Sequence, residues 1–149
     1  MSQLLEKINR DLTDAMRARD QASLSALRML KTAVKTLEIA KKNKPVSDQE
    51  LIGLIQKEIK KRVESIEHFK KGARMDLADR EEAERKILES YLPRQMDDQA
   101  LERLVREALQ AEGIGSKKDF GRAMKLVQDK AQGQADNRRI SALLNRILS

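Results

Sequence analysis

The chain has 149 residues, of which 40% are hydrophobic and 37% charged, and its net charge is +7. It contains no cysteine, which excludes disulfides, thiolate chemistry and cysteine zinc sites. No apolar run is longer than LIGLI at residues 51–55, and the amino-terminal MSQLLEKINRD has no signal-peptide core, so we expect a cytoplasmic protein that does not bind membranes.

The first two predicted helices follow from apolar spacing. One covers residues 2–18, and the next begins at Asp20 and continues until KKNKP at residues 41–45 stops it. Each is expected to bury one stripe of its surface. The two stripes are Leu5, Ile8, Leu12 and Met16, and Leu24, Leu27, Leu30, Val34 and Leu37.

The third and fourth helices are predicted from their end signals. Ser47 and Glu50 have the spacing of a capping box, so the third helix should begin near residue 48, and Gly72 is placed to end it. The fourth should run from about residue 77 to 91. The expected buried stripe of the third helix is Ile52, Ile55, Ile59, Val63, Ile66 and Phe69.

The segment YLPRQMDD predicts a domain boundary. Pro93 ends the fourth helix, Asp97 can cap a fifth, Ser116 can open a sixth, and QGQAD leads into a seventh. No segment alternates convincingly as a strand. The predicted fold is therefore all-α, with an amino-terminal helical domain over residues 1–95 that contains a long helical hairpin, and a three-helix domain over residues 96–149.

Positive charge is concentrated in two regions. Residues 28–74 carry 13 Lys/Arg against 6 Asp/Glu, and residues 114–149 carry 8 against 3. More acidic stretches separate the two regions. This pattern favours contact with a polyanion, although a solvated helix face is the alternative for any one of these cations.

The start of the last helix, DNRRI, places cations at an unfavourable position. Asp136 is a good N-cap, yet Arg138 and Arg139 fall in the first turn, where the helix dipole is positive. Each cation destabilises the helix by roughly 0.3 to 1 kcal/mol there unless a nearby negative charge compensates it. Either the charges are tolerated at a solvated end, or an anion such as an RNA phosphate binds there.

The candidate RNA contacts are basic residues on helices. Phe69, Tyr91 and Phe120 are the three aromatic residues and all belong to apolar stripes or helix ends, so a platform for stacking single-stranded bases is not expected. Contact with the phosphates of a folded RNA remains. The candidates are Lys117, Lys118, Arg122, Lys125, Arg138 and Arg139, with Arg28, Lys31 and Lys35 as a further basic stripe.

No catalytic, metal or cofactor site is predicted. His68 is the one histidine, and a single helical histidine is most often a surface residue. Phosphate-binding glycine motifs and serine nucleophile motifs are absent. An autonomous enzyme is therefore not expected.

Three segments closely resemble the YqeY family across nearly the full length of the chain. They are LSALRMLKTAVK at residues 24–35, QKEIKKRVESIEHFKKGARMDLADREEAERKILESYLPRQM at residues 56–96, and FGRAMKLVQDKAQGQADNRRISALLNRIL at residues 120–148. The resemblance implies an all-helical protein with a carboxy-terminal domain similar to the tail of GatB, a subunit of the glutamine-dependent aminoacyl-tRNA amidotransferase. In that enzyme the tail helps to hold tRNA, whereas the chemistry belongs to other regions.

The tail-like residues have structural interpretations. Met124 is expected to pack, Gly133 to permit a left-handed turn and Asp136 to cap the last helix, while Gly121 and Ala135 also match the tail. The sequence departs from the usual pattern around this turn. Gln132 and Gln134 stand where lysines are common, and Asn137 stands where glycine is common.

The sequence therefore predicts an accessory protein that binds tRNA or another structured RNA, or a tRNA-dependent enzyme, without catalysis of its own. By similarity, the chain is associated with carbon–nitrogen ligase activity that uses glutamine as the amide donor, but 149 residues offer no place for that chemistry. The alternative is a protein–protein interaction module that does not bind RNA.

Overall fold

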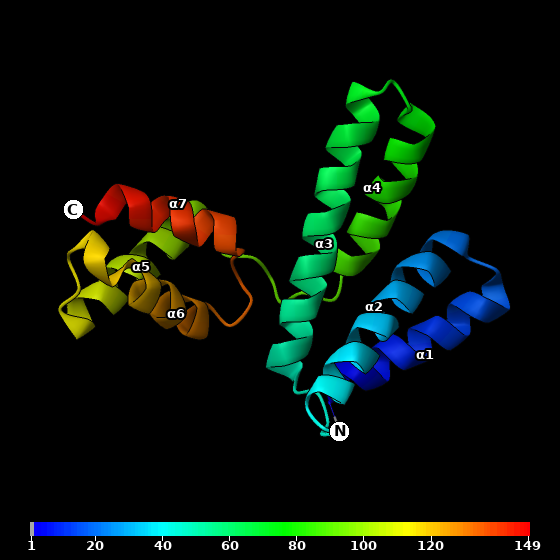
Figure 1. Ribbon diagram of the computed structural model, residues 1–149, viewed down its shortest axis with the longest axis horizontal. Helices are drawn as coiled ribbons and strands as arrows, with labels where there is room; N and C mark the ends of the chain where they lie inside the picture. Colours follow the sequence, from blue (N-terminus) through cyan, green and yellow to red (C-terminus); the bar gives the residue numbers. More distant parts are fainter. Residues whose placement is uncertain (1) are drawn as a thin grey trace. The chain divides into compact units, whose positions relative to one another are not determined.

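The computed structural model describes residues 2–149, and its α-helices confirm the predicted all-α class (Figure 1). In the described residues no strand is present. The α-helices are α1 (Gln3–Ala18), α2 (Gln21–Ala40), α3 (Asp48–Lys71), α4 (Met75–Glu89), α5 (Asp98–Glu112), α6 (Phe120–Ala131) and α7 (Asn137–Ile147), and a 3₁₀ turn, η1 (Lys117–Asp119), precedes α6. Between residues 2 and 149, none of the helices combines the length and the apolar character that a membrane crossing requires.

Contacts between Cα atoms divide the chain into two compact units. The first ends at Leu92 and the second covers Pro93–Ser149. The sequence places the boundary near residue 95. Pro93 accounts for a break at this point, because a proline has no backbone N–H to continue the helix that precedes it.

The first unit consists of two helical hairpins. Helices α3 and α4 run antiparallel and make its most extensive contact, and α2 packs against α1, α3 and α4 (Figure 1). The core contains residues from all four helices and from the segment before α3. Its buried members are Leu5, Ile8, Ala26, Leu27, Leu30, Val34, Val46, Leu51, Ile55, Leu88 and Tyr91.

The ends of α3 show why the hairpin begins and turns where it does. The predicted capping box is confirmed, because the Ser47 hydroxyl accepts from the Glu50 N–H at 3.1 Å and the Glu50 carboxylate accepts from the Ser47 N–H at 3.1 Å. Gly72 follows the last helical residue as predicted, but its φ is −85°. The left-handed conformation falls one residue later, at Ala73 with φ 57°.

One burial prediction for the first unit is wrong, and another is only partly correct. Met16 is 56% exposed, because the stripe that α1 buries ends at Ala15. The stripe predicted for α3 is only partly correct. Ile55 and Ile66 are buried, but the other fully buried positions of this helix are Leu51, Glu58 and Arg62. Helix α3 therefore turns a charged segment toward its neighbours.

The second unit is a three-helix bundle with an apolar core. Helix α6 packs against both α5 and α7, and α5 also contacts α7. Leu148 is extended, and the end of the chain lies beside the loop before η1, where the Ser149 N–H donates to the Gly115 carbonyl at 3.2 Å. The core is formed by Leu101, Val105, Ala108, Leu109, Ile114, Ala123, Val127, Ala131, Ala135, Ile140, Leu144 and Leu148.

Candidate functional site

Four of the six candidate RNA contacts lie in η1 and the first half of α6. Lys117 and Lys118 belong to η1, Arg122 and Lys125 belong to α6, and all four are exposed. Lys118, Arg122 and Lys125 are spaced four and three residues apart, so they share one face of the helical segment. We call Lys117, Lys118, Arg122 and Lys125 the α6 cation group.

The electrostatic environment of the α6 cation group is positive. Helix α6 has no acidic residue in its first turn, and the cap residue Asp119 makes no side-chain bond to the backbone of α6 among the described residues. The carboxylate of Glu112 lies 3.5 Å from Arg122, at a site where both side chains are about half exposed. The positive end of the helix dipole adds to the charge of these side chains, so an anion bound here would be stabilised.

The two arginines at the start of α7 have different environments. Arg139 Nη2 donates to the Met96 carbonyl at 2.7 Å and to Asp98 Oδ1 at 3.1 Å, so its charge is paired with a carboxylate of the second unit. Arg138 is exposed. The unfavourable position of two cations thus has two explanations: Arg139 ties α7 to the start of α5, and Arg138 faces solvent.

The turn before α7 is held by the same segment. Asp136 caps the helix as predicted, because its Oδ1 accepts from the Arg139 N–H at 2.8 Å. Gly133 has a φ of 81°, which confirms the predicted left-handed position. The Gln134 carbonyl accepts from the Met96 N–H at 2.7 Å, and the Gly133 carbonyl accepts from Gln95 Nε2 at 3.0 Å. The backbone carbonyls of Gly133 and Gln134 are therefore already hydrogen-bonded within the second unit.

The structure does not bring all six candidates together. The carboxyl end of the chain pairs with Gly115 and Lys117, so α7 runs antiparallel to α6 and its first turn lies at the other end of the bundle. The 12 residues of α6 give a separation of about 18 Å along the helix axis. Arg138 and Arg139 consequently form a second location, apart from the α6 cation group.

The remaining basic candidates lie on α2. Arg28 and Lys35 are exposed, and Lys31 is half-buried. Their spacing of three and four residues places them along one face of the helix, as the sequence predicts. This stripe belongs to the first unit, and the α6 cation group belongs to the second.

His68 lies on an exposed part of α3, beside a groove that Lys61, Arg62 and Glu81 also line. Within residues 2–149 no group of three or more His, Asp or Glu side chains is arranged to hold a metal ion.

Sequence reasoning missed a buried charge cluster in the first unit. Glu58 and Arg62 from α3 and Glu84 from α4 are 3%, 3% and 4% exposed. Arg62 Nη1 lies 3.5 Å from Glu58 Oε1, and Arg62 Nη2 lies 3.8 Å from Glu84 Oε1. We call Glu58, Arg62 and Glu84 the buried triad. The signal was in the sequence, because Glu58 and Arg62 continue the spacing of Leu51 and Ile55.

The buried triad is incompletely hydrogen-bonded. Arg62 Nη1 also donates to the Glu58 carbonyl at 3.2 Å, but Arg62 Nε has no partner in the described part of the protein. Nearby, burial and the Glu84 carboxylate raise the pKa of Glu81. A buried ion pair adds little to the unfolding free energy compared with apolar side chains of similar volume. We therefore interpret the buried triad as fixing how α3 packs against α4 rather than as stabilising the first unit.

Comparison with known proteins gives consistent matches. The family described as "Yqey-like protein" matches residues 5–148. The chain is 31% identical over 136 residues to "Altered inheritance of mitochondria protein 41, mitochondrial" of Pyrenophora tritici-repentis, covering 89% of this chain and 73% of the relative. It is 30% identical to the protein of the same name from Vanderwaltozyma polyspora, covering 75% and 64%, and 35% identical to that from Saccharomyces cerevisiae, covering 55% and 44%.

These relatives correct one expectation. A cytoplasmic location is contradicted, because the named relatives are mitochondrial proteins. The expectation came from the absence of a long apolar segment, and that property does not distinguish one aqueous compartment from another.

Proposed function

Because the chain belongs to the family of Yqey-like proteins, we propose that it is an accessory RNA-binding protein that holds a structured RNA, such as tRNA, on its second unit and carries out no reaction itself. One observation carries the proposal: four exposed cations lie in η1 and the first half of α6, and three of them are at its amino end, where the helix dipole is also positive. A phosphate backbone is the extended anion that such a surface fits best.

The aromatic residues favour a folded RNA over a single strand. Phe120 is the aromatic residue of the second unit, and it is half-buried and packs against the core. Without an exposed ring, bases cannot stack on this surface, so contact is through phosphates and shape. Arg138, at the other end of α6, provides a further phosphate contact about one helix length away.

The identity of the RNA rests on a resemblance. Residues 120–148 are similar to the tail of the GatB subunit, and that tail helps to hold tRNA. The roles that this similarity assigns to Met124, Gly133 and Asp136 are structural, which agrees with a scaffold that presents cations rather than with a catalytic site. We therefore propose that the protein acts beside a tRNA-dependent enzyme, and that any carbon–nitrogen ligase chemistry belongs to that enzyme.

The test is tRNA binding measured by fluorescence anisotropy at about 50 and about 200 mM salt. The variant carries Lys118→Glu, Arg122→Glu and Lys125→Glu. Its matched control carries Lys57→Glu, Lys60→Glu and Lys71→Glu on the exposed surface of α3, which changes the net charge equally.

We expect wild-type binding to weaken steeply with salt, and the α6 variant to bind at least about tenfold more weakly than the control. Equal weakening by the two triple variants would show attraction by net charge alone. Either that result or an absence of tRNA binding by the wild type would overturn the proposal.

Exposed apolar side chains on the first unit favour a second candidate, a protein-interaction module that does not bind RNA. Met16, Met29, Ile39 and Met75 are between 50% and 63% exposed. Methionines adapt to varied partner surfaces. This candidate predicts a complex whose affinity changes little with salt, together with no tRNA binding in the same anisotropy assay.

A further inference from the structure

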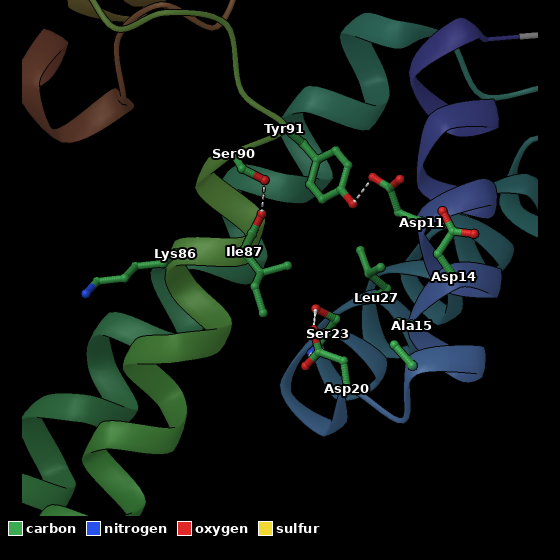
Figure 2. Close-up of a pocket in the computed structure, with 11 residues that line it drawn as sticks. Asp11, Asp14, Ala15, Asp20, Ser23, Leu27, Lys86, Ile87, Ser90 and Tyr91 are labelled. Atoms are coloured by element: carbon green, nitrogen blue, oxygen red, sulfur yellow. Dashed lines mark hydrogen bonds between the residues drawn. The ribbon is translucent and has the colours of Figure 1, made fainter.

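A groove in the first unit runs between α1 and α4, with α2 forming its floor (Figure 2). Its volume is about 520 Å³, and it is open rather than enclosed. Small molecules bind where most of their surface becomes buried, whereas an open groove between helices fits another helix laid against it.

We propose that this groove docks a cationic amphipathic helix from a partner protein. The proposal is independent of RNA binding, since the groove belongs to the first unit and the α6 cation group to the second. Three features of the groove specify this occupant: its apolar floor with small side chains, its uncompensated carboxylates and a fixed end.

The floor and the α1 wall allow a helix to approach closely. Ala15 and Ala18 lie one turn apart on α1, and of these Ala18 is exposed; Ile87 on α4 is partly exposed, whereas Leu27 on α2 is 1% exposed and closes the floor. The distance between packed helices depends on the size of the side chains at the contact, so two alanines permit close packing. An apolar stripe on the incoming helix would bury against Ala18 and Ile87, the apolar lining residues that remain accessible.

The charge of the groove selects a cation. Its lining includes Asp14 and Asp20, and neither forms an ion pair in residues 2–149. Hydrogen bonds from the Ser23 side chain and backbone lower the pKa of Asp20, so this carboxylate is ionised at neutral pH. Lys86 is the one basic residue of the lining, and its side chain extends away from α1 (Figure 2).

These carboxylates contrast with the molecule as a whole, whose net charge is +7. Arg10 and Arg17, the cations one turn from Asp14 along α1, do not line the groove. Lysine or arginine side chains on the edge of a docked helix can therefore reach Asp14 and Asp20, while a phosphate backbone would be repelled.

One end of the groove is fixed by Tyr91. Its hydroxyl donates to Asp11 Oδ2 at 2.6 Å, which ties the end of the α4 segment to α1 (Figure 2). Burial and the Asp11 carboxylate raise the pKa of Tyr91, so the phenol stays protonated and keeps donating. Lys7 lies 4.7 Å from the centre of the Tyr91 ring and 3.9 Å from Asp11, which neutralises this end.

The experiment uses a model peptide of about 18 residues in which Leu and Ala recur at helical spacing and Lys fills the other positions. A second peptide has Glu in place of every Lys. Binding to the full-length protein is measured by fluorescence anisotropy, and the binding site is located by amide NMR shifts.

We expect the Lys peptide to bind and to shift the amides of Ala15, Ala18 and Ile87, and the Glu peptide not to bind. Asp14→Lys should weaken binding about tenfold, because it places a cation against the peptide. Glu67→Lys on the exposed surface of α3 makes the same charge change outside the groove and should leave binding unchanged. Ala18→Leu should weaken binding without any change of charge.

Three results would overturn the proposal. Equal weakening by Asp14→Lys and Glu67→Lys would show that the peptide responds to net charge alone. Shifts confined to other helices would place the peptide elsewhere. Concentration-dependent self-association that Ala18→Leu abolishes would make the occupant of the groove a second copy of this chain.

Discussion

The two units of this protein use charge in opposite ways. In the first unit, Glu58, Arg62 and Glu84 are buried inside the contact between α3 and α4. In the second unit, the core is apolar throughout and the basic side chains lie outside it. The first unit therefore buries three charged residues with one another, whereas the α6 cation group of the second unit is accessible to an external partner.

This difference shows that charge counted along the sequence is a poor guide to function until burial is known. Residues 28–74 have the larger surplus of cations, yet Arg62 from that region is buried and pairs with the carboxylates of Glu58 and Glu84. Residues 114–149 have a smaller surplus, but four of their cations are exposed within η1 and the first half of α6. The second unit is thus the better candidate for binding a polyanion.

The largest expected effect comes from breaking the buried triad. Arg62→Ala leaves Glu84 buried without its cation and leaves Glu58 paired only with the exposed Lys61, 3.1 Å away, so we expect the first unit to lose about 3 to 5 kcal/mol of unfolding free energy. Tyr91 is the one tyrosine and the chain has no tryptophan, so tyrosine fluorescence during urea unfolding reports on the first unit. Arg80→Ala, at an exposed site of α4 in the same unit, should stay within about 0.5 kcal/mol of wild type.

Replacing all three residues of the buried triad should preserve or raise the unfolding free energy, in contrast to the loss expected for Arg62→Ala. The variant Glu58→Leu, Arg62→Met and Glu84→Leu removes every buried charge together, so we expect an unfolding free energy that equals the wild-type value or exceeds it by up to about 4 kcal/mol. The same fluorescence measurement applies. A loss similar to that of Arg62→Ala would mean that the ion pairs themselves stabilise the first unit, contrary to our interpretation.

The two arginines of α7 sharpen the comparison within the second unit. Arg139→Ala removes the bonds to the Met96 carbonyl and to Asp98, so we expect a loss of about 1 kcal/mol, discounted because the side chain is 28% exposed. Arg138→Ala should change stability by less than about 0.5 kcal/mol. Amide hydrogen exchange in α7 measures both. Equal effects would contradict the different environments of the two side chains.

The smallest expected effect is the pH dependence that Glu81 adds. Burial and the Glu84 carboxylate raise its pKa above the ordinary value of 4.5, so the folded state binds this proton more tightly than the unfolded chain does. Stability from this group is therefore lost as the pH rises through the window between the two pKa values. Glu81→Gln should be more stable than wild type at pH 7, and the difference should vanish below about pH 4. Thermal unfolding across this pH range checks it.

Much of the fold was predictable because local signals and packing agree. The capping box at Ser47 and Glu50, the cap at Asp136 and the left-handed Gly133 are each set by a few neighbouring residues, and each is confirmed. The stripe of α2 was also predictable, since Leu24, Leu27, Leu30 and Val34 are all buried. Apolar periodicity is sufficient where a helix buries one face of apolar side chains.

The remainder depended on contacts far apart in the sequence. The spacing of Leu51 and Ile55 places Glu58 and Arg62 on the same face of α3, but burial of these charged residues depends on Glu84, which lies on another helix. In the same way, the pairing of Arg139 with Asp98 spans 41 residues and removes one candidate cation from the free surface. The sequence therefore predicts the helices that carry the cations, but it does not predict which individual cations are exposed.

The most direct test of an RNA-binding second unit is amide NMR of the full-length protein titrated with tRNA. We expect shifts concentrated at residues 117–125 and at Arg138, with the α3–α4 hairpin unchanged and the shifts lost at high salt. Shifts confined to the first unit, or none at all, would contradict the assignment of the RNA surface to the second unit.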